Sequence, residues 1–322
     1  MHPLATSSEP VFVGIDVGGT KTLALAATSD GHILGRAVKP TPAQGSLDAV
    51  MDVIMATTGA AVSAAGVLPS TVRAAAIASA GAVSPDRGSV VWAPQIPAFI
   101  DTPVVGLFKS HWDLPTFIGN DANLAALGEQ RFGAGEGVPD LLFITVSTGI
   151  GGGIIIGGKL YTGSTGFAGE VGHMTVEANG PLGRSTTPGA WESLCGGTAL
   201  VRIAEERMAA GEATTMGGSI TAVNIFAAKR AGDALAVSIV DDATGYLAAG
   251  LTSLVNIFNP AKIIIGGGLS NEWDAYISPA VKIMRGQTFA NAGQNVLVVP
   301  PLLGADAGAL GAVALAHDLT KD

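Results

Sequence analysis

The 322-residue chain is 48% hydrophobic and only 13% charged, which permits a large buried core and excludes a generally disordered protein. Its formal net charge is −9 and no stretch concentrates lysine and arginine, so nucleic acid and anionic membrane surfaces are poor partners. The single cysteine, Cys195, excludes an internal disulfide and a multi-cysteine metal site, and it fits a reducing compartment.

Buried strands alternate with helices in the first part of the chain. Residues 47–66 and 122–133 have the pattern of helices, and Gly66 supplies a stop signal for the first of them. Asp30-Gly31, between the second and third strands, is the strongest two-residue signal for a hairpin. The strands are expected at 11–18, 22–29, 32–39, 74–81 and 116–121.

A similar pattern begins again near residue 141. The segments FVGIDVGGTKTLALAAT (12–28) and LFITVSTGIGGGIIIGG (142–158) share one plan, an apolar strand, a polar turn with glycines and a second apolar strand. Two copies of one unit predict two similar α/β domains that face each other. Further strands are expected at 141–149, 153–161, 262–268 and 295–301, and further helices at 198–210, 234–258 and 306–318.

The predicted domains are a small N-terminal α/β domain, 1–119 plus 305–322, and a large C-terminal α/β domain, 120–304. The last helix is thus expected to return and cover the first domain. The first ten residues lack the basic region and apolar run of a signal peptide. Asp241 and Asp242 interrupt the most apolar long segment. We therefore expect a cytoplasmic protein with no membrane partner.

Each repeated unit has a glycine-rich turn between its two strands. DVGGTK (16–21) combines a carboxylate, two glycines, a hydroxyl and an amine, and STGIGGG (147–153) repeats the arrangement. Glycines let backbone N–H groups converge on an anion, although either turn alone is more often a simple hairpin turn. Two such turns in equivalent places predict a site that grips a polyphosphate from both sides. A P-loop is absent, and GIGGGI lies between two strands, which excludes a dinucleotide fingerprint.

The segment GNDAN (119–123) ends a strand and begins a helix. One interpretation is that Asn120 or Asp121 caps the helix, a role that both residue types favour. The other is that Asp121 accepts a proton from a substrate hydroxyl that attacks a phosphoryl group, with Asp16 in a magnesium shell. The spacing alone leaves both interpretations open.

Five motifs in the expected order make the chain resemble the ROK family (repressors, open reading frames and sugar kinases) of the actin-like ATPase-domain superfamily. The resemblance implies a two-domain actin-like ATPase (ribonuclease H-like) fold with an interdomain active-site cleft, and a homodimer. ROK repressors carry an N-terminal helix-turn-helix domain, and a first phosphate strand at residue 11 favours the kinase branch. The motifs are VGIDVGGTKT, GNDANLAALGE, TVSTGIGGGII, GFAGEVGHMTV and IIIGGGLS.

The same resemblance assigns roles to individual residues. It implies that Asp16 lies near Mg²⁺, through water, and that Asp121 is the catalytic base. It implies ATP contacts at Gly18, Gly19, Thr20, Lys21, Thr148, Gly149, Gly151, Gly152, Gly266, Gly267 and Gly268. It implies sugar contacts at Gly81, Gln95, Asn120, Asp121, Glu170, His173 and Glu192.

The loop between His173 and Glu192 departs from the family pattern. In most ROK sugar kinases a histidine and three cysteines, spaced Cys-x-Cys-x4-Cys, bind zinc. Counted from His173, the cysteine places here hold other residues, and one remaining histidine does not make a zinc site. We expect no structural zinc, with the loop ordered by Pro181, Pro188 and Trp191 packing, or by bound substrate. The three cysteine places are Gly183, Ser185 and Ala190.

A second departure concerns the sugar. ROK hexokinases often have Asn-Leu-Pro-Gly-Trp where this chain has PQIPAF (94–99), so Gln95 stands at the sugar-facing asparagine and Phe99 at the tryptophan. The expected function is an ATP-dependent kinase for the primary hydroxyl of a hexose, as in a glucokinase. The alternatives are a kinase for an amino sugar, an N-acylhexosamine or a C7 cyclitol and, from another class, a non-catalytic sugar sensor.

Overall fold

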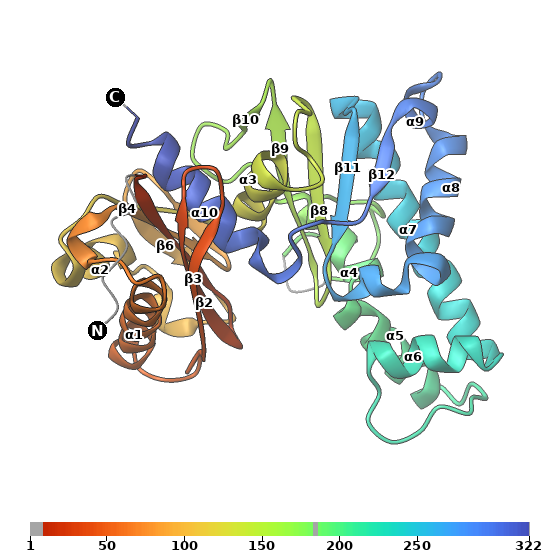
Figure 1. Ribbon diagram of the computed structural model, residues 1–322. Helices are drawn as coiled ribbons and strands as arrows, with labels where there is room; N and C mark the ends of the chain where they lie inside the picture. The colour runs from red at the N-terminus through yellow and green to blue at the C-terminus, as the bar shows by residue number, and fades with distance from the viewer. Residues whose placement is uncertain (1–8, 183–185, 322) are drawn as a thin grey trace. The chain divides into compact units, whose positions relative to one another are not determined.

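The computed structural model describes residues 9–182 and 186–321 (Figure 1). The chain divides into two compact units. The first unit comprises Met1–Pro139, Gly153–Gly169 and Pro301–Asp322, and the second comprises Asp140–Gly152 and Glu170–Pro300. Residues 120–139 and 153–169 thus lie in the first unit, whereas the predicted domain boundary falls after residue 119.

The first unit contains a five-stranded sheet in the order β3-β2-β1-β4-β7. β1 pairs antiparallel with β2, and β2 antiparallel with β3, while β1–β4 and β4–β7 are parallel. A hairpin joins β2 to β3, as predicted, and Gly31 adopts φ 86° in its turn, where a residue without Cβ is favoured. The strands are β1 (Val11–Val17), β2 (Lys21–Thr28), β3 (Ile33–Pro40), β4 (Val72–Ser79) and β7 (Thr116–Asn120).

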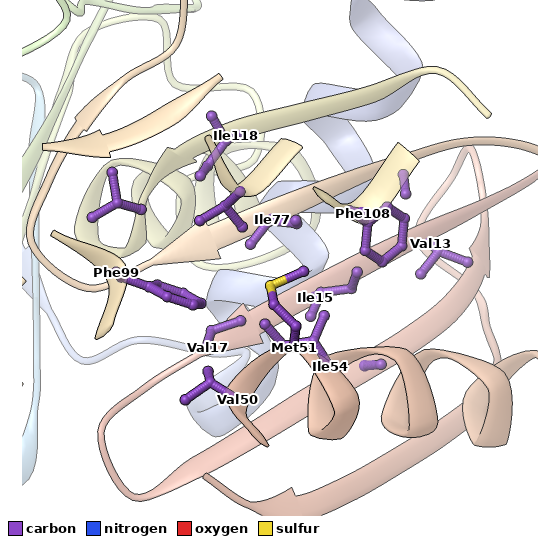
Figure 2. Packing of buried hydrophobic residues seen from close by; sticks show 14 of the residues in the cluster. Val13, Ile15, Val17, Val50, Met51, Ile54, Ile77, Phe99, Phe108 and Ile118 are labelled. Atoms are coloured by element: carbon purple, nitrogen blue, oxygen red, sulfur yellow. The ribbon is translucent and has the colours of Figure 1, made fainter. Parts of the chain in front are cut away.

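Helices cover both faces of this sheet. Successive residues of β1 point to opposite sides, so β1 contributes apolar side chains to the packing on each face. Val13 and Ile15 join a hydrophobic cluster with Ile54 of helix α1 (Leu47–Ala64), as Figure 2 shows. Phe12 instead joins a second cluster with Val313 of helix α10 (Ala307–Asp318). The predicted return of the last helix to the first sheet is therefore observed.

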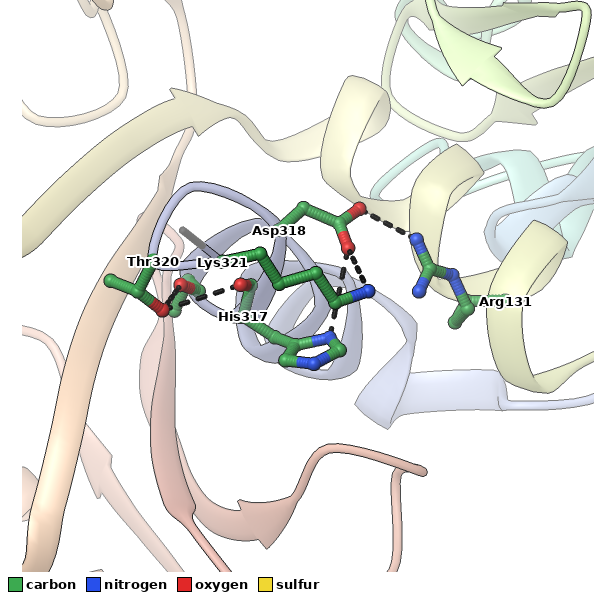
Figure 3. Close-up of polar contacts among 6 residues, drawn as sticks. Arg131, His317, Asp318, Thr320 and Lys321 are labelled. Atoms are coloured by element: carbon green, nitrogen blue, oxygen red, sulfur yellow. Dashed lines mark hydrogen bonds and ion pairs between the residues drawn. The ribbon is translucent and has the colours of Figure 1, made fainter.

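Helix α3 (Asp121–Phe132) packs closely against α10. A Cβ at Gly128 would overlap the carbonyl of Ala307, and a Cβ at Gly311 would overlap the carbonyl of Leu124, so both glycines permit backbone contact. Near the C-terminal ends of the two helices, Arg131 Nη2 and Asp318 Oδ2 form an ion pair at 2.6 Å (Figure 3). This packing places α3 in the first unit.

Glu129 of α3 is fully buried and connects its helix to the chain before α10. Its carboxylate accepts hydrogen bonds from the backbone N–H groups of Ala134 (2.8 Å), Leu302 (3.1 Å) and Leu303 (2.8 Å). Glu129→Ala would leave these donors without their acceptor, and we expect the free energy of unfolding to fall by about 3 kcal/mol. The urea concentration at the unfolding midpoint measures the change. Glu129→Gln keeps one acceptor oxygen, and its midpoint should lie between those of the wild type and Glu129→Ala. A midpoint equal to that of the wild type would contradict the assigned role.

The second sheet has the strand order β10-β9-β8-β11-β12, and the division between the units falls within β9. β11 is parallel to both β8 and β12. The predicted continuous strand 153–161 is wrong: Gly157 and Gly158 adopt φ 58° and 75° and turn the chain between β9 and β10. The strands are β8 (Leu141–Val146), β9 (Ile150–Ile156), β10 (Lys159–Leu160), β11 (Lys262–Gly266) and β12 (Leu297–Val299).

Several short elements were not predicted. In the first unit they are β5 (Ala82–Ser84), β6 (Ser89–Trp92) and α2 (Val104–Trp112). The second unit contains α4 (Trp191–Cys195), α5 (Gly197–Ala209), α6 (Ala222–Arg230), α7 (Ala234–Phe258), α8 (Ser278–Gln287) and α9 (Ala292–Asn295), of which only α5 and α7 were predicted. By length and composition α1 and α7 could cross a membrane, but buried core helices meet the same criterion, and both bury one face here.

Candidate active site

The first glycine turn follows β1 directly. Gly18 N donates to Lys21 O at 3.0 Å, so residues 18–21 form the tight connection to β2. Asp16 is half-buried near the end of β1. Burial, and next the charge of Asp121, raise the pKa of Asp16 to about 7, while Lys21 acts in the opposite direction. Two carboxylates therefore repel one another at this end of the sheet, and such a pair favours a bound cation.

The beginning of α3 resolves which residue caps the helix. Asn120 is the N-cap: its Oδ1 accepts from Asn123 N at 3.0 Å, and its Nδ2 donates to Gly81 O at 3.0 Å. Asp121 occupies the first helical position, and its Oδ1 accepts from Ala122 N at 2.9 Å. The capping role thus belongs to Asn120, and Asp121 is placed at the positive end of the helix dipole. β4 pairs Ala78 with both Asp16 and Gly119, so Asp16 and Asp121 lie at the same end of the sheet.

Gln95 lies against the first glycine turn. A Cβ at Gly19 would be 3.2 Å from Gln95 Cβ. Phe99, four residues later, is fully buried in the cluster of Figure 2 and belongs to the core. The sugar contacts expected of Gln95, Asn120 and Gly81 stay predictions, and the structure brings these three residues to the first unit's turn and helix start.

The second glycine turn is shorter than its sequence suggested. Ser147 N donates to Gly149 O at 2.9 Å, and β9 begins at Ile150, so Gly151 and Gly152 lie in the strand rather than in the turn. The start of α5 holds the turn, because Gly197 N donates to Ser147 O at 2.7 Å. Thr198 N likewise donates to Thr148 O at 2.9 Å.

More glycines surround this turn than the sequence analysis assigned to the site. A Cβ at Gly196 would be 3.2 Å from the Cα of Gly149, and one at Gly197 would be 2.8 Å from Ser147 O. Gly267 has φ 88°, and a Cβ there would overlap the carbonyl of Val146. Gly267 and Gly268 therefore lie next to the end of β8 and the turn. The adenosine contact expected of Gly266, Gly267 and Gly268 stays a prediction. Gly196 and Gly197 were missed, although their pairing in the sequence was a visible signal.

Three predicted sugar-binding residues gather in the second unit. His173 Nε2 is 3.7 Å from Glu170 Oε2, and Ile150 N donates to Glu192 Oε2 at 3.4 Å. Burial raises the pKa of Glu170, the His173 side chain lowers it, and the Glu192 charge raises it. His173 Nδ1 is buried and has no hydrogen-bond partner within 9–182 and 186–321. The cluster offers acceptors and an imidazole, which suit the hydroxyls of a sugar.

Backbone hydrogen bonds order the loop that leads to Glu192. Val176 N donates to Gly189 O at 2.9 Å, and Gly189 N donates to Pro181 O at 2.9 Å. Trp191 N donates to Met174 O at 2.8 Å. Of the three cysteine places, Gly183 and Ser185 lie outside the described residues, and Ala190 is fully buried.

Trp191 anchors the loop to α7, as its predicted packing role requires. Its side chain is fully buried, its Nε1 donates to Tyr246 O at 2.9 Å, and a Cβ at Gly250 would overlap its ring. Tyr246 also donates its hydroxyl to Glu177 Oε2 at 2.9 Å. Within the described parts of the chain, no group of three or more His, Cys, Asp or Glu side chains is placed to hold a metal ion.

Cys195, the free cysteine of the chain, is a small buried residue. It is fully buried, its thiol donates to Trp191 O at 3.2 Å, and burial raises the pKa of that thiol. Tyr276 donates its hydroxyl to Cys195 O at 2.6 Å. These contacts fix the end of α4, the helix that carries Glu192.

Known proteins are similar to this chain over nearly its whole length. The glucokinase of Streptomyces coelicolor (strain ATCC BAA-471 / A3(2) / M145) is 36% identical over 318 residues, 95% of this chain and 97% of that protein. The structure of a ROK family glucokinase from Streptomyces griseus in complex with glucose and AMPPNP is 35% identical, with a TM-score of 0.78. That similarity covers 96% of this chain and 99% of the other.

Fold, glycine turns and similarities together define the class: an ATP-dependent carbohydrate kinase with the two-domain actin-like ATPase fold. The chain belongs to the ROK family, whose model matches residues 12–319. The bifunctional enzyme NanE/NanK of Brucella suis biovar 1 (strain 1330) is also similar, 34% identical over 316 residues, 97% of this chain and 54% of that protein. The predicted family, fold class and enzyme class are confirmed.

Proposed function

We propose that this kinase transfers the γ-phosphoryl group of ATP to the primary hydroxyl of a hexose, with Asp121 as the base. The observation that carries the proposal is that Asp16, near the end of β1, and Asp121, at the first position of α3, lie at the same end of the sheet, next to the glycine turn 18–21. The hydroxyl oxygen forms a bond to the γ-phosphorus, the bond from that phosphorus to the bridging oxygen of ADP breaks, and Asp121 takes the proton.

Other residues of both units position the reactants in this proposal. Asp16 would hold Mg²⁺ through a coordinated water molecule, whose hydrogen its carboxylate accepts, and bound MgATP would supply the phosphoryl group. The turns at 18–21 and 148–149, with Gly151 and Gly152, bind phosphates through backbone N–H groups, and 266–268 lie by the adenosine. Gly81, Gln95, Asn120, Glu170, His173 and Glu192 contact the sugar.

A coupled ADP-release assay with a substrate panel tests the proposal. The panel contains glucose, mannose, fructose, N-acetylglucosamine, N-acetylmannosamine, an unacetylated amino sugar and a C7 cyclitol. Strong turnover on glucose or another unmodified hexose is the expected result. Turnover confined to the N-acetylated or amino sugars, or to the cyclitol, would support the second candidate, which Gln95 and the similarity to NanE/NanK motivate.

The raised pKa of Asp16 predicts how the Mg²⁺ requirement depends on pH. A carboxyl group with a pKa of about 7 is mostly protonated below that pH, and a protonated, neutral carboxyl group does not help to bind a cation. The Mg²⁺ concentration for half-maximal activity should therefore rise as pH falls below 7, approaching about tenfold per unit. Titrations at pH 6, 7 and 8 measure it, and a requirement that is constant over this range would refute the role of Asp16.

The altered loop predicts a kinase that needs no structural zinc. Its anchors are hydrogen bonds and the packing of Trp191 on α7. Removal of divalent metal with a chelator, followed by readdition of Mg²⁺, should restore full activity and leave the thermal midpoint unchanged. Metal analysis of the purified protein giving about one tightly bound zinc per chain would contradict this.

A cytoplasmic homodimer completes the proposal, and light scattering after gel filtration measures the oligomeric state.

A further inference from the structure

A cavity of about 610 Å³ lies within the first unit, on the free side of the edge strand β7. Its volume is in the range of small-molecule sites, about 300–1,000 Å³. All five residues of β7 line it, together with the loop after β5, α2, the loop after β10 and the end of α10. Of the residues assigned above to the candidate active site, only Asn120 takes part in the lining.

The cavity carries positive charge in an acidic chain. Its lining includes Arg87 and Lys109 and a single carboxylate, Asp86. Arg87 Nε donates to Ser84 Oγ at 3.2 Å, and neither cation forms an ion pair with a carboxylate among the described residues. With a chain charge of −9, two cations that lack carboxylate partners in one cavity select an anion.

The same lining contains a buried hydrogen-bond acceptor that suits a hydroxyl donor of a ligand. Asn123 is only 4% exposed, and its Nδ2 donates to Ala168 O at 3.3 Å. Its Oδ1 has no hydrogen-bond partner in the part of the chain that the structure describes. An amide oxygen buried without a donor is costly, so a ligand hydroxyl at this point would be stabilised.

From these observations we propose that the cavity binds a small phosphorylated polyol or sugar, with its phosphate at Arg87 and Lys109 and a hydroxyl donating to Asn123 Oδ1. The backbone N–H of Asn123 also completes the cap of α3, two residues after Asp121. Occupancy therefore bears on the helix start that carries the proposed base. The binding itself does not depend on the proposed reaction.

Isothermal titration calorimetry on the full-length chain tests the site, with glucose 6-phosphate, glycerol 3-phosphate, inorganic phosphate and glucose as probes. At least one of the two organic phosphates should bind with a dissociation constant below about 1 mM, and at least tenfold more tightly than inorganic phosphate. The tighter of the two shows whether the ligand resembles a hexose phosphate or a shorter polyol phosphate. Equal affinity for inorganic phosphate would overturn the hydroxyl contact, and absence of heat with all phosphates would overturn the site.

The variant Arg87→Ala/Lys109→Ala separates this cavity from the active site, which could also hold a sugar phosphate. It should bind the organic phosphate at least tenfold more weakly, with an unchanged thermal midpoint because both side chains are exposed. Lys39→Ala/Arg73→Ala removes the same charge from the same unit, outside the cavity, and should bind like the wild type. Undiminished affinity in the first variant would overturn the proposal.

Discussion

Asp121→Ala should lower kcat by about a thousandfold or more while the dissociation constant of the sugar changes little. The expectation follows from the place of Asp121 at the first position of α3, beside Asp16, where its carboxylate can take the proton of the attacking hydroxyl. Asp121→Asn keeps the size of the side chain and should lose nearly as much, because an amide cannot accept that proton. Steady-state ADP release and sugar binding by calorimetry measure the two quantities.

Asp48→Ala is the matched control for Asp121→Ala. Asp48 also lies in the first turn of a helix of the first unit, at the exposed start of α1. Its removal should leave kcat unchanged. This result would show that loss of a negative charge at the start of a helix is not sufficient to lower kcat. A wild-type protein that binds sugar but shows no turnover with any substrate, and no change on loss of Asp121, would instead be the sensor considered from the sequence.

Gly250→Ala should disturb the sugar site from a distance, through Trp191. The new Cβ would overlap the buried indole ring, whose displacement moves α4 and therefore Glu192. Overpacking of a filled core costs about 1–3 kcal/mol, and we expect the KM for sugar to rise at least tenfold. The KM for ATP should change far less, because Glu192 is assigned to the sugar. Kinetics with each substrate varied in turn measure both constants.

The same helix offers the control. Gly245 lies five residues earlier on α7, and a Cβ there would meet nothing within 4 Å, so Gly245→Ala should keep wild-type kinetics and gain slight stability. Trp191→Phe provides a rescue: combined with Gly250→Ala, the smaller ring should restore part of the affinity for sugar. If Gly250→Ala raised the KM values for sugar and ATP equally, Trp191 would be a general packing residue rather than one that positions Glu192.

Patterns along the chain were enough for the elements whose signal is local. The apolar run of β1, the hairpin signal at Asp30-Gly31 and the long apolar pattern of α7 each identify an element within one or two residues of its observed bounds. Short elements such as α2 and α4 escaped, because five to nine residues carry too little periodicity to separate a helix from a loop. The second glycine turn was predicted to extend to residue 153, although β9 begins at Ile150, because glycines are compatible with both turn and strand.

By itself, the sequence determined the family, the α/β fold and the two glycine turns with Asp16 and Asp121 at strand ends. These features depend on residue type and local order, which the chain displays directly. Only the tertiary structure decided that Asn120 rather than Asp121 caps α3, that Gly196 and Gly197 support the second turn, and that Trp191 anchors the loop before Glu192. Gly196, Gly197 and Trp191 act through contacts whose partners are chosen by packing, and Asn120 has one such contact as well, from its Nδ2 to Gly81 O. Packing brings together residues whose separation in the sequence carries no signal.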